Sequence, residues 1–263
     1  MVKILCIPDA HAKPGVSNRR FTWLGKYIAE TQPDIIINIG DWYDMESLSS
    51  YDKFKMSFEG RSYKKDIDAG IEALKLVDIE IKKLNVKLKQ AKKKQYKPRK
   101  ITLLGNHCER ISRAINMQRE LEGTIGYEDL KFEEYGWEVV PYLKPIFIEE
   151  VAFAHYFSTG VMGKAVSGET PALKLIKTQF HSCVMGHVHT RDFAERTGAD
   201  GKRKIGLIIG CYLDPEQWES YAGEANKIWW KGLVMLNNVK DGGFDPEFIS
   251  IDTLQERYGW LST

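Results

Sequence analysis

The sequence predicts an α/β fold with a parallel sheet, and three short apolar runs support this prediction. Residues 2–7, 34–39 and 101–104 are rich in β-branched and apolar side chains, and the chain turns at a proline or a glycine after each run. Residues 21–31 lie between the first two runs and show helical spacing of apolar residues. The order strand, helix, strand is typical of a βαβ unit, which builds a parallel sheet.

Residues 63–95 are expected to form one long helix. Residues 81–100, at its end, contain ten Lys and Arg and no Asp or Glu. Such a run is typical of a solvated helix face. The alternative is a patch that attracts the phosphates of a nucleic acid, whose affinity would fall steeply with salt. The apolar stripe of the helix consists of Ile67, Ile71, Leu74, Ile81, Leu84 and Leu88.

Beyond a further helix expected at 108–118, the pattern changes to short strand-like runs. The sequence contains no internal repeat and no low-complexity linker. Residues 1–263 are therefore expected to form a single domain, with a strand-rich C-terminal cap over about 190–263. The expected strands are 138–140, 146–148, 151–155, 182–185, 204–209 and 233–237, with a helix at 173–179.

Composition excludes several classes of protein. Hydrophobic residues make up 43% of the chain and charged residues 28%, which is ordinary for a folded globular protein. No apolar run reaches the roughly 18 residues of a membrane span, and no signal peptide is visible. A disulfide framework is not expected, because the cysteines lie far apart without a Cys-x-x-Cys pair, so reduced thiols and a cytoplasmic location are predicted. The four cysteines are Cys6, Cys108, Cys183 and Cys211.

Five of the six histidines follow apolar strand-like runs, and most have a glycine or a carboxylate beside them. Sites in open α/β sheets form outside the carboxyl ends of strands, so these segments should bring their polar side chains to one edge. Each short pattern alone is commonly a turn or a buried histidine, but the complete set predicts a metal site. His181 precedes its strand and is expected to be structural. The five are His11, His107, His155, His187 and His189.

These motifs resemble, in order and spacing, the five blocks of the calcineurin-like metallophosphoesterase superfamily. A looser similarity relates the layout to small phage and bacterial phosphoesterases. The resemblance implies a two-sheet sandwich flanked by helices, with a dinuclear metal site at the C-terminal ends of strands. The matching pieces are Asp9-Ala10-His11, Gly40-Asp41-Trp42-Tyr43-Asp44, Gly105-Asn106-His107, His155 and Gly186-His187-Val188-His189.

The resemblance also implies how the metal ligands divide. One ion would bind Asp9, His11 and His189, the other would bind Asn106, His155 and His187, and Asp41 would bridge the two. Imidazole, carboxylate and amide ligands suit Mn²⁺, which is the expected ion, and also Fe²⁺, Zn²⁺, Co²⁺ and Ni²⁺. Two such ions about 3.5–4 Å apart can hold a hydroxide that attacks phosphorus.

His107 is the motif histidine without a metal, and the resemblance implies that it is the general acid for the leaving group. Asp44 is expected to support that imidazole, the alternative being a surface carboxylate. Arg110 and Arg113, on the helix after the third block, are candidates to bind a substrate phosphate, the default expectation being that they are solvated helix residues. Cys108 is expected to be a small buried residue rather than a reactive thiol.

The predicted function is a metal-dependent phosphodiesterase or nuclease that acts on DNA, RNA or a nucleotide. One alternative is a phosphomonoesterase, and another is a non-catalytic binding protein. A Ser/Thr protein phosphatase is disfavoured, because Met45 and Cys108 stand where those enzymes carry Arg and Glu. Four aromatic residues late in the chain either stack bases or cap the sheet: Trp218, Tyr221, Trp229 and Trp230.

Overall fold

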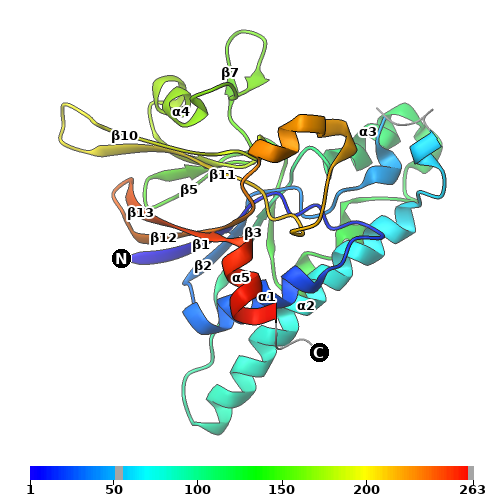
Figure 1. Ribbon diagram of the computed structural model, residues 1–263, viewed down its shortest axis with the longest axis horizontal. Coiled ribbons are helices and arrows are strands. Elements are labelled where there is room, and N and C mark those ends of the chain that lie inside the picture. Colours follow the sequence, from blue (N-terminus) through cyan, green and yellow to red (C-terminus); the bar gives the residue numbers. More distant parts are fainter. Residues whose placement is uncertain (51–55, 260–263) are drawn as a thin grey trace.

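The computed structural model describes residues 1–50 and 56–259, and two β-sheets form the centre of the molecule (Figure 1). In the six-stranded sheet, the first four strands along the chain pair in parallel, as the apolar runs predict, and two later strands add antiparallel pairs beside β1. Its strands are, in spatial order, β13 (Gly243–Ser250), β12 (Gly232–Lys240), β1 (Val2–Ile7), β2 (Ile35–Asn38), β3 (Arg99–Leu103) and β4 (Glu138–Val140).

The second sheet has five strands and is mixed. Its central strands pair in parallel, and an antiparallel strand closes each edge. A separate two-stranded hairpin, β7 (Ser158–Thr159) with β8 (Lys164–Ala165), follows β6. The five strands are, in spatial order, β10 (Arg191–Thr197), β11 (Arg203–Ile209), β9 (Ser182–Met185), β6 (Val151–Phe153) and β5 (Ile146–Ile148).

Alternating side chains divide the core into three layers. Ile4 and Cys6 face the second sheet and pack with its apolar residues, such as Phe153. Leu5 and Ile7 point the other way, toward the helices. α1, α2 and α5 cover that outer face and α4 covers the second sheet, so the layers run helix, sheet, sheet, helix. The helices are α1 (Arg19–Thr31), α2 (Tyr63–Gln90), α3 (Glu109–Met117), α4 (Pro171–Gln179) and α5 (Ile251–Tyr258).

The long helix is shorter than the sequence predicts: it ends at Gln90 and not near residue 95. Lys92 has a left-handed backbone with φ of 54°, and the side chain of Asn85 accepts a hydrogen bond from the Tyr96 N–H at 2.7 Å and donates one to the Tyr96 carbonyl at 2.9 Å. These contacts fold the chain back along the helix. The hydroxyl of Tyr96 then donates to the carbonyl of Pro33, just before β2.

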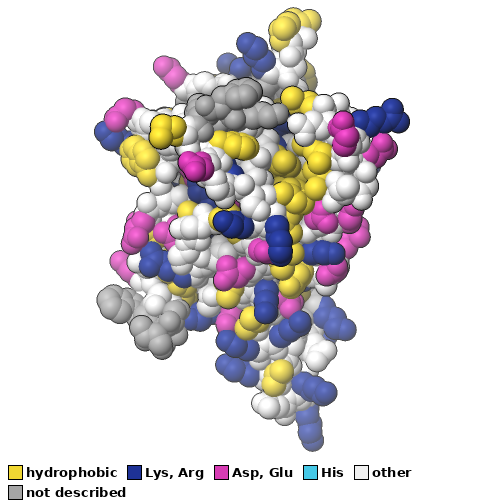
Figure 2. Space-filling view, turned by 90° about the vertical axis from the view of Figure 1, so that its right-hand side faces the viewer, with side chains coloured by type: hydrophobic (Ala, Val, Ile, Leu, Met, Phe, Trp, Pro, Cys, Tyr) yellow, Lys and Arg dark blue, Asp and Glu magenta, His cyan; other side chains and the backbone are white. Residues whose placement is uncertain are grey.

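The lysine-rich segment therefore lies at the amino end of the parallel strands. Figure 2 shows Lys and Arg side chains gathered over the lower end of the molecule, where the C-terminal part of α2 lies in Figure 1. Most of the basic side chains of residues 81–100 are exposed. Lys82 and Lys83 pair with Asp78 and Glu80 of the same helix, as in an ordinary solvated helix face.

The strands beyond residue 190 complete both main sheets. β10 and β11 belong to the second sheet, and β12 lies directly beside β1 in the first. This part of the chain therefore supplies pairing partners for both sheets. Among the described residues, no helix is both long and apolar enough to cross a membrane.

Arg20 ties the start of α1 to the loop after β1. Its side chain is fully buried, and it donates to the carbonyl oxygens of Ala10 at 2.8 Å, Ser17 at 2.7 Å and Tyr212 at 3.0 Å. Burial lowers the pKa of this guanidinium to about 10. Arg20 thus satisfies three backbone carbonyls with a single side chain.

Replacing Arg20 with methionine should lower the free energy of unfolding by about 2–4 kcal/mol, because it leaves buried carbonyls without donors. Urea denaturation measures this change. Arg19→Met is the matched control: Arg19 is partly exposed and pairs with Asp214 and Glu216, so its loss should cost about 1 kcal/mol or less. Equal effects of the two substitutions would contradict the assigned role of Arg20.

Candidate metal centre

The residues predicted to bind metal all follow the carboxyl ends of strands, and they come from both sheets. Asp9 and His11 follow β1, Asp41 follows β2, and Asn106 follows β3. From the second sheet, His155 follows β6, and His187 and His189 follow β9. All seven side chains therefore meet at one edge of the sandwich.

Backbone hydrogen bonds hold these loops together. The N–H of His11 donates to the carbonyl of Asp41 at 2.9 Å, which joins the loops after β1 and β2. In the second sheet the N–H of Gly186 donates to the carbonyl of His155 at 3.1 Å. The N–H of His187 donates to the carboxylate of Asp9 at 3.0 Å and thereby links the two sheets at the site.

Two motif glycines are required because their backbones lie too close to a carboxylate for any side chain to fit. A Cβ on Gly105 would lie 2.0 Å from Oδ1 of Asp41, and one on Gly186 would lie 2.3 Å from Oδ1 of Asp9. Neither carboxylate can move away, because each also accepts a hydrogen bond from a backbone N–H of a neighbouring loop. The glycines therefore allow the backbone to pass directly behind the two carboxylates.

Four of the predicted ligands have left-handed backbone conformations, which non-glycine residues adopt infrequently. The φ angles are 44° at His11, 47° at Asp41, 69° at His187 and 59° at His189. Such conformations cost free energy and cluster at functional sites. Their concentration here indicates that the surrounding loops hold these side chains in set directions.

Asp9, His11 and His189 form the first group of side chains. Nε2 of His189 lies 3.1 Å from Oδ2 of Asp9, and Nε2 of His11 lies 4.0 Å from the same oxygen. The His11 and His189 rings stand edge to face with centroids 5.1 Å apart. All three residues are buried and close enough to share one metal ion.

The second group surrounds Asp41. Nε2 of His155 lies 2.8 Å from Oδ1 of Asn106 and 3.2 Å from Oδ2 of Asp41. The ring of His187 stands 5.1 Å from that of His155 and 4.7 Å from that of Tyr156. Asp41 and Asp9 are each close enough to His155 to share an ion with it, so the two groups are continuous.

The donor set fits a divalent cation. Nδ1 and Nε2 of His11, and Nδ1 of His189, are buried without a hydrogen-bond partner among the described residues, which is costly for polar atoms. They lie beside the carboxylates of Asp9 and Asp41, themselves almost fully buried. Imidazole nitrogens and carboxylate oxygens that converge in this way are typical ligands of transition-metal ions.

The charges of the group are strongly coupled. Burial alone would lower the pKa of His11, but the carboxylates of Asp44, Asp9 and Asp41 raise it to about 10. Burial also lowers the pKa of His155, but the charges of Asp41 and Asp9 outweigh this effect and raise the pKa to about 9. Burial raises and the histidines lower the pKa of Asp41, with the net result well below its usual range. The carboxylates therefore stay ionised and attract a cation.

His107 lies beside this group and is held by Asp44. Its Nδ1 is 2.9 Å from Oδ1 and 2.6 Å from the carbonyl oxygen of Asp44. Its Nε2 faces Asp41, 3.9 Å from Oδ2. Asp44 is buried, so the alternative of a surface carboxylate is wrong. Burial lowers the pKa of His107, with Asp41 opposing and His11 and Arg110 adding to the effect.

The two arginines predicted to bind substrate lie differently. Arg110 donates to the carbonyls of Asp44 at 2.9 Å and Met45 at 3.2 Å, and its Nη2 is 3.3 Å from Nε2 of His107. Its guanidinium thus stabilises, by hydrogen bonds, the loop that contains Asp44. Arg113 is exposed and donates to the carbonyl of Asn106 at 2.6 Å.

Sequence reasoning missed Lys13 and Glu219. Nζ of Lys13 lies 2.6 Å from Oε1 of Glu219 and 3.3 Å from Oδ2 of Asp44. The lysine therefore connects the loop that supports His107 with the segment before η6 (Ser220–Ile228). The two residues are 206 positions apart, and no local pattern marks such a pair.

The four late aromatic residues lie in different environments. Trp230 packs against Phe248 with ring centroids 5.7 Å apart, beside the core between the sheets. Trp229 stands edge to face against His189 at 4.3 Å. Trp218 and Tyr221 are more than half exposed and line a cavity at the site.

His181 and Cys108 lie apart from the metal centre's chemistry. His181 precedes β9, at the end opposite the predicted ligands, and its ring packs on Phe147 with centroids 5.4 Å apart. Cys108 is almost fully buried, and burial raises the pKa of its thiol well above the usual range. A buried thiol of this kind is unreactive.

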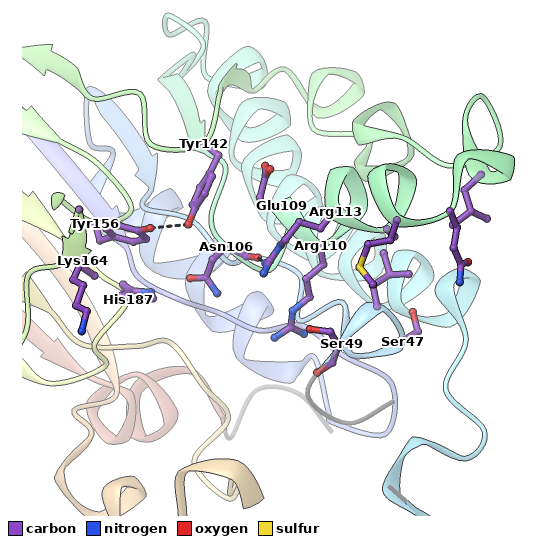
Figure 3. Close-up of a pocket in the computed structure, with 18 of the residues that line it drawn as sticks. Ser47, Ser49, Asn106, Glu109, Arg110, Arg113, Tyr142, Tyr156, Lys164 and His187 are labelled. Carbon is purple, nitrogen blue, oxygen red and sulfur yellow. Dashed lines mark hydrogen bonds between the residues drawn. The ribbon is translucent and has the colours of Figure 1, made fainter. Parts of the chain in front are cut away.

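Two cavities flank the centre. One, of about 770 Å³, extends from Asn106 and His187 along α3 (Figure 3). The other, of about 570 Å³, is lined by the predicted ligands other than His155, together with Trp218 and Tyr221. Asn106, His187 and Arg110 line both, so the two cavities meet beside the metal centre.

Comparisons with known proteins add little to this geometry. No protein-family model and no curated protein matches the sequence. A solved structure described as Yfce, a phosphoesterase from E. coli, is similar over 95% of this chain and 99% of that chain, with a TM-score of 0.39 and 11% sequence identity. A likeness at that TM-score carries no argument about function, so the functional inference has to come from the site.

Proposed function

We propose that this chain is a metal-dependent phosphoester hydrolase that binds two divalent ions. One observation carries the proposal: histidine, aspartate and asparagine side chains from both sheets, all buried or half-buried, converge on one edge, with His107 facing them. The proposed ligands are Asp9, His11 and His189 for one ion, and Asn106, His155 and His187 for the other, with Asp41 between them. Mn²⁺ is the proposed ion.

Bound metal ions would supply a hydroxide nucleophile and neutralise charge on the phosphoryl oxygens. The protein's own contribution is to position the acid. As an imidazolium, His107 would donate from Nδ1 to the carboxylate of Asp44 and hold a second proton on Nε2 for the departing oxygen. Asp41 and Asp44 favour this protonated form, against the burial that lowers the pKa of His107. Arg110 donates hydrogen bonds to the carbonyls of Asp44 and Met45. These bonds would hold Asp44 and His107 in position beside the metal centre.

The two cavities favour a phosphodiester over a phosphomonoester. A phosphate at the centre would have room for one substituent beside Trp218 and Tyr221 and for another along α3. A monoester would fill only one of these spaces. We therefore propose a phosphodiesterase or nuclease that acts on DNA, RNA or a nucleotide, with phosphomonoesterase activity as the second candidate.

The basic segment at the end of α2 does not contribute to this site. It lies at the amino end of the parallel strands, whereas the proposed metal ligands follow the carboxyl ends. A nucleic acid bound there would not enter either cavity at the same time without crossing the length of the sheet. The proposal of a nucleic-acid substrate thus rests on the cavities and not on this helix.

The proposal is tested with bis-p-nitrophenyl phosphate and p-nitrophenyl phosphate, in Mn²⁺ and in EDTA. We expect Mn²⁺-dependent hydrolysis with the higher kcat/KM on the diester. Mn²⁺ at 100 times its Kd should also stabilise the fold by about 2.7 kcal/mol, measurable as a rise in Tm that EDTA reverses. Stabilisation by Mn²⁺ without hydrolysis of either ester would favour a non-catalytic binding protein instead.

A further inference from the structure

The cavity along α3 has two walls that carry cationic side chains. Arg110 and Arg113 project from α3 on one side, and Lys164 projects from β8 on the other. Figure 3 shows Lys164 and Arg113 on either side of Asn106 and His187. A ligand group that extends from the metal centre into this cavity would therefore pass between positive charges.

Two of these cations have no fixed acidic partner. Among the residues that the structure describes, no carboxylate forms an ion pair with Arg113 or Lys164, whereas Arg110 is engaged by the loop under His107. The acid on this wall, Glu109, is engaged too: it accepts from the Ser112 hydroxyl at 2.5 Å and from the Tyr127 hydroxyl at 2.6 Å. These hydroxyls leave the negative charge of Glu109 in place, so the described lining of the cavity carries three cationic side chains against one carboxylate and is net positive.

The other cavity is different in this respect. Beyond the predicted metal ligands, three carboxylates in its lining are matched by three cationic side chains: Asp44, Glu46 and Glu219 by Lys13, Arg61 and Arg110. The two sides of the metal centre are therefore electrostatically unequal. A second anionic group on the substrate would strengthen binding through electrostatic attraction only when that group points into the cavity along α3.

We infer that the cavity along α3 is a subsite for a second phosphate of the substrate, which Arg113 and Lys164 bind. This inference rests on the proposed function, because the first phosphate is placed at the metal centre. Arg113 contacts the carbonyl of Asn106, whose side chain belongs to that centre, so the subsite directly adjoins the place of the first phosphate. Met117 and Leu121 supply an apolar lining at the far end, which suits the organic body of a nucleotide.

The substrate class that fits is a phosphodiester with a further phosphate, such as a nucleotide strand, rather than a diester with neutral substituents. Binding to the Mn²⁺-loaded protein, measured by calorimetry at low salt, should be about tenfold or more tighter for thymidine 3′,5′-bisphosphate than for thymidine 5′-monophosphate. Arg113→Gln and Lys164→Gln should each lower this ratio, and the double variant should bring it close to one. Lys177→Gln, an exposed lysine of α4 outside both cavities, should keep it.

The outcomes separate the subsite from the catalytic proposal. Equal binding of the two nucleotides to the unaltered protein, or an unchanged ratio in the double variant, would overturn the subsite. The catalytic proposal would instead be refuted, and the subsite kept, if the affinity ratio of the two nucleotides depends on Arg113 and Lys164 but no diester is hydrolysed. Lys164→Gln alone decides the matter if Arg113→Gln disturbs the loop of Asn106, since the structure gives Lys164 no contact to that loop.

Discussion

Replacing Asp41 with asparagine should lower metal-dependent turnover of a phosphodiester by about three orders of magnitude. The substitution keeps the shape of the side chain but removes the charge that we place between two cations. Stabilisation by metal ions is worth several kcal/mol in the transition state, and about 4 kcal/mol corresponds to a thousandfold in rate. Metal content, measured on the purified protein after dialysis, should fall together with turnover.

Asp41 also accepts a hydrogen bond from the N–H of His107 at 2.9 Å, so a loss of activity alone would not prove metal binding. The metal content is the deciding measurement. Asp192→Asn is a suitable control, because this carboxylate on β10 accepts from the N–H of Ala172 in α4 and lines neither cavity. Full metal content with activity within tenfold of the unaltered protein would contradict the role proposed for Asp41.

Replacing His107 with alanine should leave metal binding intact and reduce turnover in a way that depends on the leaving group. Loss of a general acid typically costs about 10²–10⁴-fold. The full cost should appear with a diester whose leaving group is an alkoxide, because that oxygen needs the proton. With p-nitrophenolate, a good leaving group, the cost should be much smaller. Steady-state kinetics on both diesters, with metal analysis, measure this selectivity.

Asp44→Asn should show the same selectivity at smaller amplitude, because Nδ1 of His107 would still meet the backbone carbonyl of residue 44. Two results would refute the assignment. The first is loss of bound metal in the His107 variant. The second is an equal loss of turnover on both substrates, which points to a disturbed centre rather than a missing proton donor.

The interior strands could be predicted because their sequence reports their environment directly. Strands β1, β2 and β3 are covered on both faces or nearly so, and such strands read as continuous apolar runs. The edge strands β10 and β13 were missed for the opposite reason. β10 contains the charged residues Arg191 and Asp192 and β13 contains Pro246, and edge strands commonly carry charges and proline. α5 directly follows β13 and was missed with it.

Long-range partners could not be predicted, because nothing local records them. Arg20 has the sequence context of a polar helix residue, yet it is fully buried and donates to the carbonyls of two segments far apart in the sequence, at Ala10 and Tyr212. The end of α2 depended on Asn85 meeting Tyr96, which only the returning chain allows. The interpretation of the α2 lysines as substrate contacts likewise depended on which end of the sheet they occupy.

The sequence by itself determined the chemistry of the site. Asp, Asn and His placed after successive apolar runs identify both the side chains and the edge where they meet, because parallel strands share one carboxyl end. The tertiary structure alone decided how those side chains are held and what lies around them: Asp44 under His107, Lys13 against Glu219, and two cavities of unequal charge. Such contacts arise when distant loops pack together, and a one-dimensional pattern contains no record of which loops those are.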